Sequence, residues 1–183
     1  LATLQNLSQG RLILGAGVGW LEAEFDALGV PFRERGRRMD EGIAMMKAVW
    51  SQDPVTFDAR WIPAKIEDMR SQPLPVAPIP IWIGGSSDAA INRALRLDGW
   101  HGSRTPPEKA VEVVKRLRAA RPDPAFTISL RVSCSAGTVG SMRDTLAAYR
   151  DAGVQHVMAA PEDRELDAYL STAEAFRRAG EGL

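Results

Sequence analysis

The feature that most constrains the fold of this chain is an alternation between short apolar segments and segments of helical periodicity. Each apolar segment is short enough for a strand and is closed by glycine or polar residues, as strands buried in a parallel sheet are. Each is followed by a stretch whose apolar residues recur three and four positions apart, the period of an amphipathic helix. Such alternation builds a parallel sheet that helices cover, so the sequence predicts an α/β fold. The expected strands lie near residues 11–16, 80–84, 99–102, 126–133 and 154–160.

A long segment between the first two strands lacks this alternation. Residues 53–80 contain six prolines and no sustained period, which indicates an insertion, with a small hairpin near 55–62. Before it, apolar residues at helical spacing predict a helix over 38–51. We expect a single domain over residues 1–183. Its five strands fit either an open doubly wound sheet or five-eighths of a (β/α)8 barrel, which typically needs about 250 residues.

Composition excludes several classes of protein. Because 23 Lys and Arg residues balance 23 Asp and Glu residues, we expect no nucleic-acid or membrane partner, either of which would favour an excess of positive charge. No apolar run approaches the roughly 20 residues of a membrane helix. Cys134 is the single cysteine of the sequence, which rules out a disulfide framework and a cysteine-rich metal site. The chain starts at Leu1 with no charged leader, so we expect a reducing, cytoplasmic location.

The first glycine-rich segment is Gly15–Gly19, directly after the first expected strand. It does not fit a dinucleotide-binding fingerprint, because the third glycine would fall on Trp20 and residues 31–35 form a turn and a charge run instead of a strand. Two interpretations stay open: a loop that only lets the chain turn, or a ligand loop at the carboxyl end of a strand. The run at 33–38 (RERGRR) is expected to be a solvated face, with a clamp for an anionic ligand as the alternative.

The second glycine-rich segment, Gly84-Gly85-Ser86-Ser87, is the better candidate site. A strand ends there and a helix begins, so backbone N–H groups and the helix dipole favour an anion such as phosphate. The alternative is that Ser86 or Ser87 only caps the helix, and Asp88 supports it by already placing negative charge in the first turn.

Other residue patterns carry weaker signals. The sequence contains no G-x-S-x-G nucleophile motif and no P-loop lysine motif. The two histidines are far apart in sequence, so we predict no metal site; His101 is expected as a surface or core residue, with a place at a site as the alternative, and His156 as a packing residue. Residues 126–133 alternate, with Thr127, Ser129, Arg131 and Ser133 on one face. In a barrel that face lines the lumen, where Arg131 needs a partner or a ligand.

Several blocks together resemble one known family. Residues 2–20 (ATLQNLSQGRLILGAGVGW) and 27–32 (ALGVPF), followed by 80–85 (PIWIGG) and 98–100 (DGW), are similar to the luciferase-like flavin and deazaflavin oxidoreductases. The resemblance covers residues 1–104 well and the C-terminal third weakly, and its nearest group is thought to use coenzyme F420.

The resemblance implies a (β/α)8 TIM barrel of the bacterial-luciferase type in which about five β/α units are present. The segment at 53–80 would be the long insertion of that family, and the chain would begin just before strand four, without strands one to three.

The same resemblance implies positions that bind the cofactor. Val18 and Gly19 match family positions that contact the cofactor chain, and Ser103 matches a hydroxyl position near the cofactor's phosphate. The matching phosphate-binding loop consists of Gly84, Gly85, Ser86 and Ser87. No catalytic acid or base can be carried over onto this chain.

Three functions are therefore in competition. The first is hydride transfer between coenzyme F420 and a small organic substrate, and the second is an FMN-dependent luciferase-like monooxygenase. The third is a non-catalytic fragment or binding subunit. A sheet of only five strands has two exposed edges, which are commonly covered by another chain or by disordered segments, so we also expect either a homo-oligomer or missing segments.

Overall fold

A computed structural model of the chain describes residues 1–103 and 105–183. The described residues form two compact units, 1–80 and 81–183, and each is presented by itself. The single domain expected from the sequence stays a prediction. Within the described residues, no helix combines the length and the apolar character that crossing a bilayer requires.

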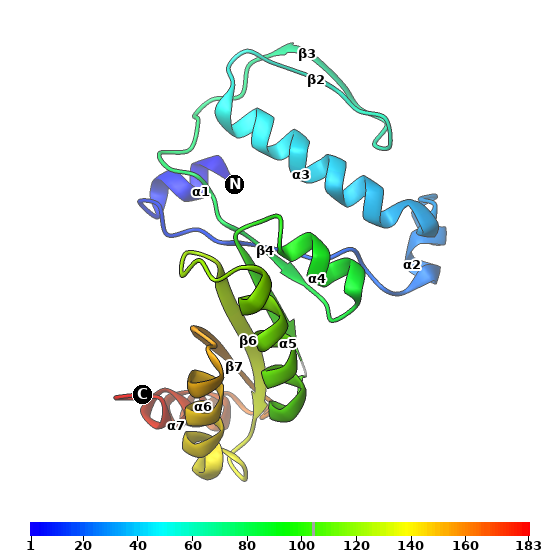
Figure 1. The fold of residues 1–183 in the computed structure, drawn as a ribbon. Helices are drawn as coiled ribbons and strands as arrows, with labels where there is room; N and C mark the ends of the chain where they lie inside the picture. Colours follow the sequence, from blue (N-terminus) through cyan, green and yellow to red (C-terminus); the bar gives the residue numbers. More distant parts are fainter. Residues whose placement is uncertain (104) are drawn as a thin grey trace. The chain divides into compact units, whose positions relative to one another are not determined.

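The first unit contains one short strand of the predicted alternation, several helices and a hairpin (Figure 1). Its elements are α1 (Ala2–Leu7), β1 (Leu14–Ala16), α2 (Glu22–Ala27), η1 (Phe32–Glu34), α3 (Arg35–Ser51), β2 (Val55–Asp58) and β3 (Lys65–Met69). The antiparallel pair β2–β3 confirms a hairpin in the expected insertion, although its second strand begins beyond residue 62.

Strand β1 is shorter than the expected 11–16. The backbone N–H of Leu12 donates its hydrogen bond to a side chain and not to a neighbouring strand. The Gln5 side chain is fully buried; its Oε1 accepts from Leu12 N at 2.9 Å, and its Nε2 donates to the carbonyl oxygens of Ala77 and Pro78 at 3.2 and 3.1 Å. This one amide thus joins α1, the approach to β1 and the end of the insertion within the first unit.

The arginine run at 33–38 is not the simple solvated face that the sequence suggested. The Arg35 guanidinium lies 3.7 Å from the centre of the Phe32 ring, and Arg37 lies 4.7 Å from that of Trp61. Arg38 donates to the Trp61 carbonyl oxygen. Guanidinium groups stack well on aromatic faces, so the run packs helix α3 against its neighbours in the first unit.

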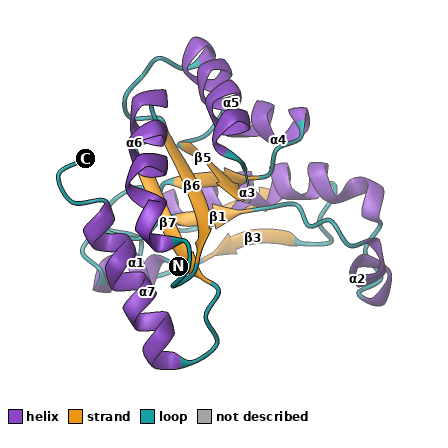
Figure 2. Ribbon diagram, turned by 90° about the horizontal axis from the view of Figure 1, so that it is seen from below, coloured by secondary structure: helices purple, strands orange, loops and turns teal. Residues whose placement is uncertain are grey.

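The second unit is a β/α sheet. Its elements are β4 (Ile81–Gly84), α4 (Asp88–Ala94), β5 (Gly99–Ser103), α5 (Pro107–Ala120), β6 (Thr127–Cys134), η2 (Val139–Ser141), α6 (Met142–Ala152), β7 (His156–Pro161) and α7 (Leu166–Ala179). In the described part of this unit, four strands lie in the order β4-β5-β6-β7, and each pair is parallel. Figure 2 shows β5, β6 and β7 as neighbouring strands with α5 and α6 beside them. The predicted α/β fold is confirmed.

The alternation along β6 separates two faces of this sheet. On the helix-covered face, Cys134 packs with Met142 and Leu146 of α6 and with Phe176 of α7, and Val132 lies against this cluster. The opposite face, called the polar face below, carries Thr127, Ser129, Arg131 and Ser133 from β6. Because the strands are in register, His101 and Ser103 of β5 and His156 of β7 lie on the same face.

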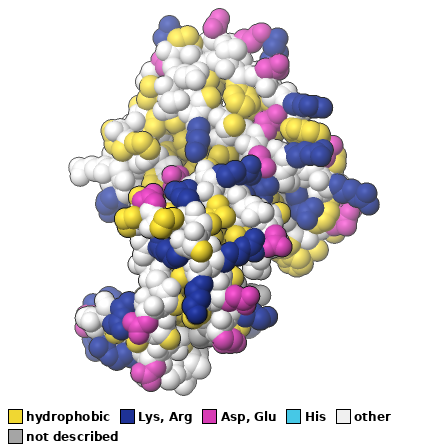
Figure 3. Space-filling view, viewed as in Figure 1, with side chains coloured by type: hydrophobic (Ala, Val, Ile, Leu, Met, Phe, Trp, Pro, Cys, Tyr) yellow, Lys and Arg dark blue, Asp and Glu magenta, His cyan; other side chains and the backbone are white. Residues whose placement is uncertain are grey.

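Charged side chains are mixed on the surface. On the face shown in Figure 3, Lys and Arg side chains are interspersed with Asp and Glu side chains. Helix α7 shows the pattern in detail: Arg177 and Arg178 donate hydrogen bonds to Glu174, and these bonds lower the pKa of Glu174 to about 2. Such exposed pairs contribute little to stability.

Gly99 makes room for the largest side chain on the polar face. A Cβ at position 99 would lie 2.6 Å from the Thr127 carbonyl oxygen and 2.6 Å from Cδ1 of Trp82. The Trp82 indole therefore extends over β5 at Gly99, where β5 has no side chain. Trp82 is 9% exposed.

We expect Gly99→Ala to lower the free energy of unfolding by about 1–3 kcal/mol, because overpacking forces the sheet backbone or Trp82 to move. Denaturant unfolding followed by circular dichroism measures this loss. Gly140→Ala is the matched control, since a Cβ there meets nothing within 4 Å. Equal stability of the two variants would contradict the tight packing at Gly99.

Candidate functional site

The loop after β4 is held in place from both sides. Gly85 has φ +113°, a conformation that side chains rarely adopt, and a Cβ there would lie 3.1 Å from Cβ of Ala90. Its carbonyl oxygen accepts a hydrogen bond from Nε1 of the buried Trp100 at 2.8 Å. The predicted Gly84–Ser87 loop therefore has one defined backbone shape.

Ser87 is the N-cap of α4. Its Oγ accepts from Ala90 N at 3.3 Å, which confirms the capping interpretation for this residue. Asp88, in the first turn, forms an ion pair with Arg116 of α5, so its charge is already compensated. Ser86 is exposed. Phosphate binding by this loop stays a prediction.

A small polar pocket lies at the carboxyl ends of β5, β6 and β7. Its volume is about 150 Å³, and its lining comprises Ser103, Arg131, Ser133, Ala160, Pro161 and Glu162. Ser103 and Arg131 are directly paired in the sheet register, and the side chains of both point to the polar face. Arg131 is exposed, and the acidic residue Glu162 lines the same pocket. The pocket thus offers one guanidinium, two hydroxyl groups and one carboxylate to a ligand.

Sequence reasoning identified part of this pocket. Ser103 was predicted as a site residue, and the alternation of β6 marked Arg131 as a charge in need of a partner or a ligand. Glu162 was missed, although its place directly after β7 (His156–Pro161) was a usable signal, because ligand-binding residues collect where parallel strands end.

The polar face also contains a hydrogen-bonded line of three side chains. Nδ1 of His101 lies 2.9 Å from Oγ of Ser129, and the same oxygen lies 2.8 Å from Nδ1 of His156. Ser129 is fully buried, His101 is half-buried and His156 is exposed. The ring of His156 also packs edge-on against Trp82, with centroids 5.3 Å apart. His156 is thus the packing residue that we expected and a hydrogen-bonding residue as well.

Burial holds the pKa of His101 below its ordinary value, and the nearby His156 and Arg131 lower it further. A neutral imidazole is therefore favoured at position 101. Among the described residues, no group of three or more His, Cys, Asp and Glu side chains is placed to hold a metal ion.

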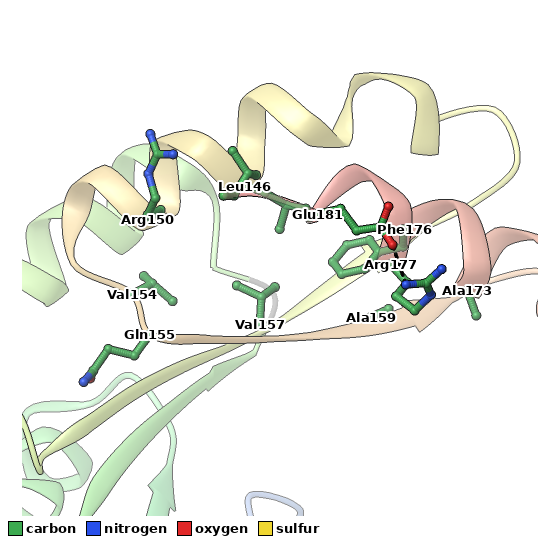
Figure 4. A pocket seen from close by; sticks show the side chains of 12 residues that line it. Leu146, Arg150, Val154, Gln155, Val157, Ala159, Ala173, Phe176, Arg177 and Glu181 are labelled. Carbon is green, nitrogen blue, oxygen red and sulfur yellow. Dashed lines mark hydrogen bonds and ion pairs between the residues drawn. The ribbon is translucent and has the colours of Figure 1, made fainter.

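A larger groove of about 490 Å³ lies between β7, α6 and α7 (Figure 4). Leu146 and Phe176 line it from the helices, and Val157 and Ala159 line it from the strand. Because these strand residues point to the helix-covered face, the groove does not open at the carboxyl ends where parallel α/β folds bind ligands. We do not assign it as the site.

The remaining predicted site residues, Val18 and Gly19, lie in the first unit after β1. Gly19 has φ +81°, and a Cβ there would lie 2.8 Å from the Phe25 ring, so local packing alone requires glycine. Val18 is half-buried. Their role toward a cofactor stays a prediction, as does their proximity to the loop at Gly84–Ser87.

Comparison with known proteins gives a family match over almost the whole chain. The model of the luciferase-like monooxygenase family matches residues 1–181. An uncharacterized protein of Mycobacterium tuberculosis is 38% identical over 119 residues, which cover 63% of this chain and 41% of the relative. The FMNH2-dependent dimethylsulfone monooxygenase of Pseudomonas fluorescens is 35% identical over 104 residues, which cover 55% of this chain and 28% of that enzyme. The chain thus spans less than half the length of these relatives.

Two solved structures share the fold. An F420-dependent secondary alcohol dehydrogenase, in complex with an F420-acetone adduct, superposes with a TM-score of 0.73 at 15% identity, over 96% of this chain and 73% of the enzyme. The coenzyme F420-dependent tetrahydromethanopterin reductase of Methanopyrus kandleri gives 0.66 at 14% identity, over 98% of this chain and 75% of that enzyme. The chain therefore has five β/α units of a luciferase-like TIM barrel.

We expect Ser87→Ala to lower the free energy of unfolding of the chain by about 0.5–2 kcal/mol, because the N–H of Ala90 loses its acceptor. Ser86→Ala, at the exposed neighbouring position, is the control and should be neutral within about 0.5 kcal/mol. Chemical denaturation of both variants measures the difference. A loss at Ser86 equal to that at Ser87 would contradict the assignment of the cap.

We expect the contribution of His101 to the stability of the chain to be lost as the pH falls below about 6.5. Because the pKa of His101 is lower in the folded chain than the unfolded value of about 6.5, the unfolded chain binds more protons in this range. This contribution is therefore full above the unfolded pKa and is lost as the pH falls through the folded one. His101→Gln should reduce the slope of Tm against pH; an unchanged slope would contradict the shift.

Proposed function

The chain belongs to the luciferase-like monooxygenase family, and on this basis we propose that it serves an oxidoreductase that transfers a hydride between coenzyme F420 and a small organic substrate. The observation that carries the proposal is the polar pocket at Ser103, Arg131 and Ser133. F420 and FMN both contain phosphate. A guanidinium beside two hydroxyl groups can donate hydrogen bonds to the anionic oxygens of a phosphate. The residues present therefore fit such a cofactor.

The Gly84–Ser87 loop would provide a second anchor for the cofactor. It follows β4, which is the direct neighbour of β5, and Gly84 is paired with His101 in the register. With no side chain at positions 84 and 85, the backbone can approach a ligand closely. We propose that Gly84, Gly85, Ser86 and Ser87 bind the cofactor together with Ser103, and that Val18 and Gly19 contact its chain.

The bound cofactor would supply the hydride chemistry, and the protein would supply binding, orientation and exclusion of water. In this chain, Arg131 would bind the anionic group of the cofactor at the carboxyl ends of the strands. Glu162 lines the same pocket, and its carboxylate has the same sign of charge as the ligand. It would repel the anionic group and so limit where that group can bind.

A second candidate is an FMN-dependent monooxygenase. It is supported by the 35% identity to the FMNH2-dependent dimethylsulfone monooxygenase, whereas the F420-dependent structures are 14–15% identical. A third is a fragment or binding subunit that holds a cofactor or a partner without turnover.

Absorbance spectroscopy of the chain mixed with each cofactor distinguishes these candidates. Retention of F420 through gel filtration with a shifted violet band supports the first function, and retention of FMN with its double flavin band supports the second. Retention of a cofactor without turnover of acetone, 2-propanol or dimethyl sulfone favours the third, and retention of neither contradicts the first two.

We further propose a homo-oligomer in the cytoplasm. Strand β7 lies at one end of the strand order, and edge strands are commonly covered by another chain. The buried, free Cys134 is compatible with a reducing compartment. Sedimentation of the purified chain measures the oligomeric state, and a monomer at high concentration would contradict it.

We expect Gly85→Asp and Arg131→Gln each to weaken F420 binding at least about tenfold. The first places a carboxylate where the backbone must approach the ligand, and the second removes a charge-assisted hydrogen bond of about 1.5–3 kcal/mol. Isothermal titration with F420 and with FMN measures both effects, with circular dichroism as the check on folding.

Glu162→Gln is the matched control for Arg131→Gln. It removes a negative charge from the same pocket, so it should leave affinity unchanged or raise it. Unchanged affinity in a folded Arg131→Gln variant of a chain that binds F420 would contradict the pocket as the anion site.

A further inference from the structure

The His101–Ser129–His156 line on the polar face has no part in the binding function proposed above. Its three residues come from adjacent strands β5, β6 and β7 and occupy directly paired positions, since His101 is opposite Ser129 and Ser129 is opposite His156. The sheet register, and not side-chain flexibility, therefore brings the groups together. Both contacts to the Ser129 oxygen are within normal hydrogen-bond length, at 2.9 and 2.8 Å.

The single proton of a hydroxyl group determines which groups donate and which accept along this line. Ser129 has one proton, so it can donate to the Nδ1 of only one imidazole. When both rings are neutral, the other ring must donate its own Nδ1 proton to the serine oxygen. One histidine then has a free lone pair on Nε2, and the other has a proton on Nε2. When both of these protons move by one hydrogen bond, one ring also releases its Nε2 proton and the other gains a proton on Nε2, the rings stay neutral and exchange these roles.

Burial decides what the line connects. His156 is exposed to solvent, Ser129 is fully buried and His101 is half-buried. A proton can therefore enter from water at His156, pass the buried hydroxyl group of Ser129, and leave from His101.

The groups around His101 favour transfer of a proton through its ring over retention of a positive charge on it. Arg131 from β6 and His156 from β7 are the charged and titratable groups that act on His101, and Trp82 from β4 packs against His156. Burial and these two groups lower the pKa of His101, so a positive charge is not retained there. An imidazole that is neutral near neutral pH can act as both acid and base.

We propose that His156, Ser129 and His101 form a proton-transfer line that supplies the proton accompanying hydride transfer, with His101 as the donor to the substrate oxygen. This inference depends on the proposed function. A carbonyl carbon that gains a hydride, with its two electrons, must also gain one proton on its oxygen.

The protons balance along the line. The Nε2 proton of His101 moves to the substrate oxygen, the Ser129 hydroxyl proton moves to Nδ1 of His101, and the Nδ1 proton of His156 moves to Oγ of Ser129. A solvent acid then protonates Nε2 of His156. The electrons come from the reduced deazaflavin, whose second proton is released to solvent. Oxidation of an alcohol uses the same transfers in reverse.

The first test needs no cofactor. Long-range 1H–15N NMR of the chain with 15N-labelled histidine reports which ring nitrogen of each imidazole is protonated. At a pH where both rings are neutral, we expect one ring with the proton on Nδ1 and the other with it on Nε2. Ser129→Ala should abolish the Nδ1-protonated form, and Thr127→Ala, which removes a hydroxyl from the same face of the same strand, should not. Two Nε2-protonated rings in the parent chain would overturn the proposal.

The second test measures turnover of acetone by the chain with reduced F420. We expect Ser129→Ala and His156→Gln to lower kcat at least about tenfold while the Kd for F420 changes less than twofold, with Thr127→Ala at parent values. The dependence of kcat on pH should also flatten in both variants. Parent kcat in a folded Ser129→Ala variant that binds F420 would overturn the role of the line.

The two tests separate failure of the line from failure of the proposed function. If the parent chain binds no F420, the proposed function fails for this chain, and the proton donor role fails with it. The NMR result then decides on the hydrogen-bonded line alone: opposite tautomers that require Ser129 support it, and tautomers unaffected by Ser129→Ala overturn it.

Discussion

The register of β6 between its two neighbours determines the geometry of the second unit. Each residue of this strand is paired with a fixed partner on β5 and on β7, and its side chains alternate between an apolar, helix-covered face and a polar face. A shift of one residue would send Arg131 into the helix-covered core and turn Leu130 toward the polar face. Because burial of Leu130, which is 1% exposed, opposes that shift, hydrophobic packing on one face holds the polar groups of the other in place.

Much of this arrangement could be predicted from the sequence because it depends on local patterns. Alternation along residues 126–133 identified both faces of β6, and glycine and proline marked the ends of the elements. The cap at Ser87 and the positive φ of Gly85 also follow from local rules on helix starts and tight turns.

What escaped prediction depends on contacts between distant segments. The line through Ser129 requires knowledge of which residue on each neighbouring strand is opposite it, and a sequence pattern does not contain that pairing. The arginine run at 33–38 was interpreted from its charge alone, whereas its guanidinium groups pack on aromatic rings, one of them 23 or more positions away along the chain. The family resemblance implied the loops for the cofactor but gave no role to the histidines.

The residues that positions 82 and 99 can accept are related, because the Trp82 and Gly99 sites are in contact. The indole of Trp82 extends over β5 where Gly99 has no side chain, and a methyl group at that position would overlap both the indole and the neighbouring backbone. A smaller residue at position 82 would relieve only the contact with the ring, since the Thr127 carbonyl oxygen would still be 2.6 Å away. Position 99 is therefore the more restricted of the two, because a change at position 82 alone makes no room for a side chain there. The backbone of a third strand favours glycine at position 99 whatever residue occupies position 82.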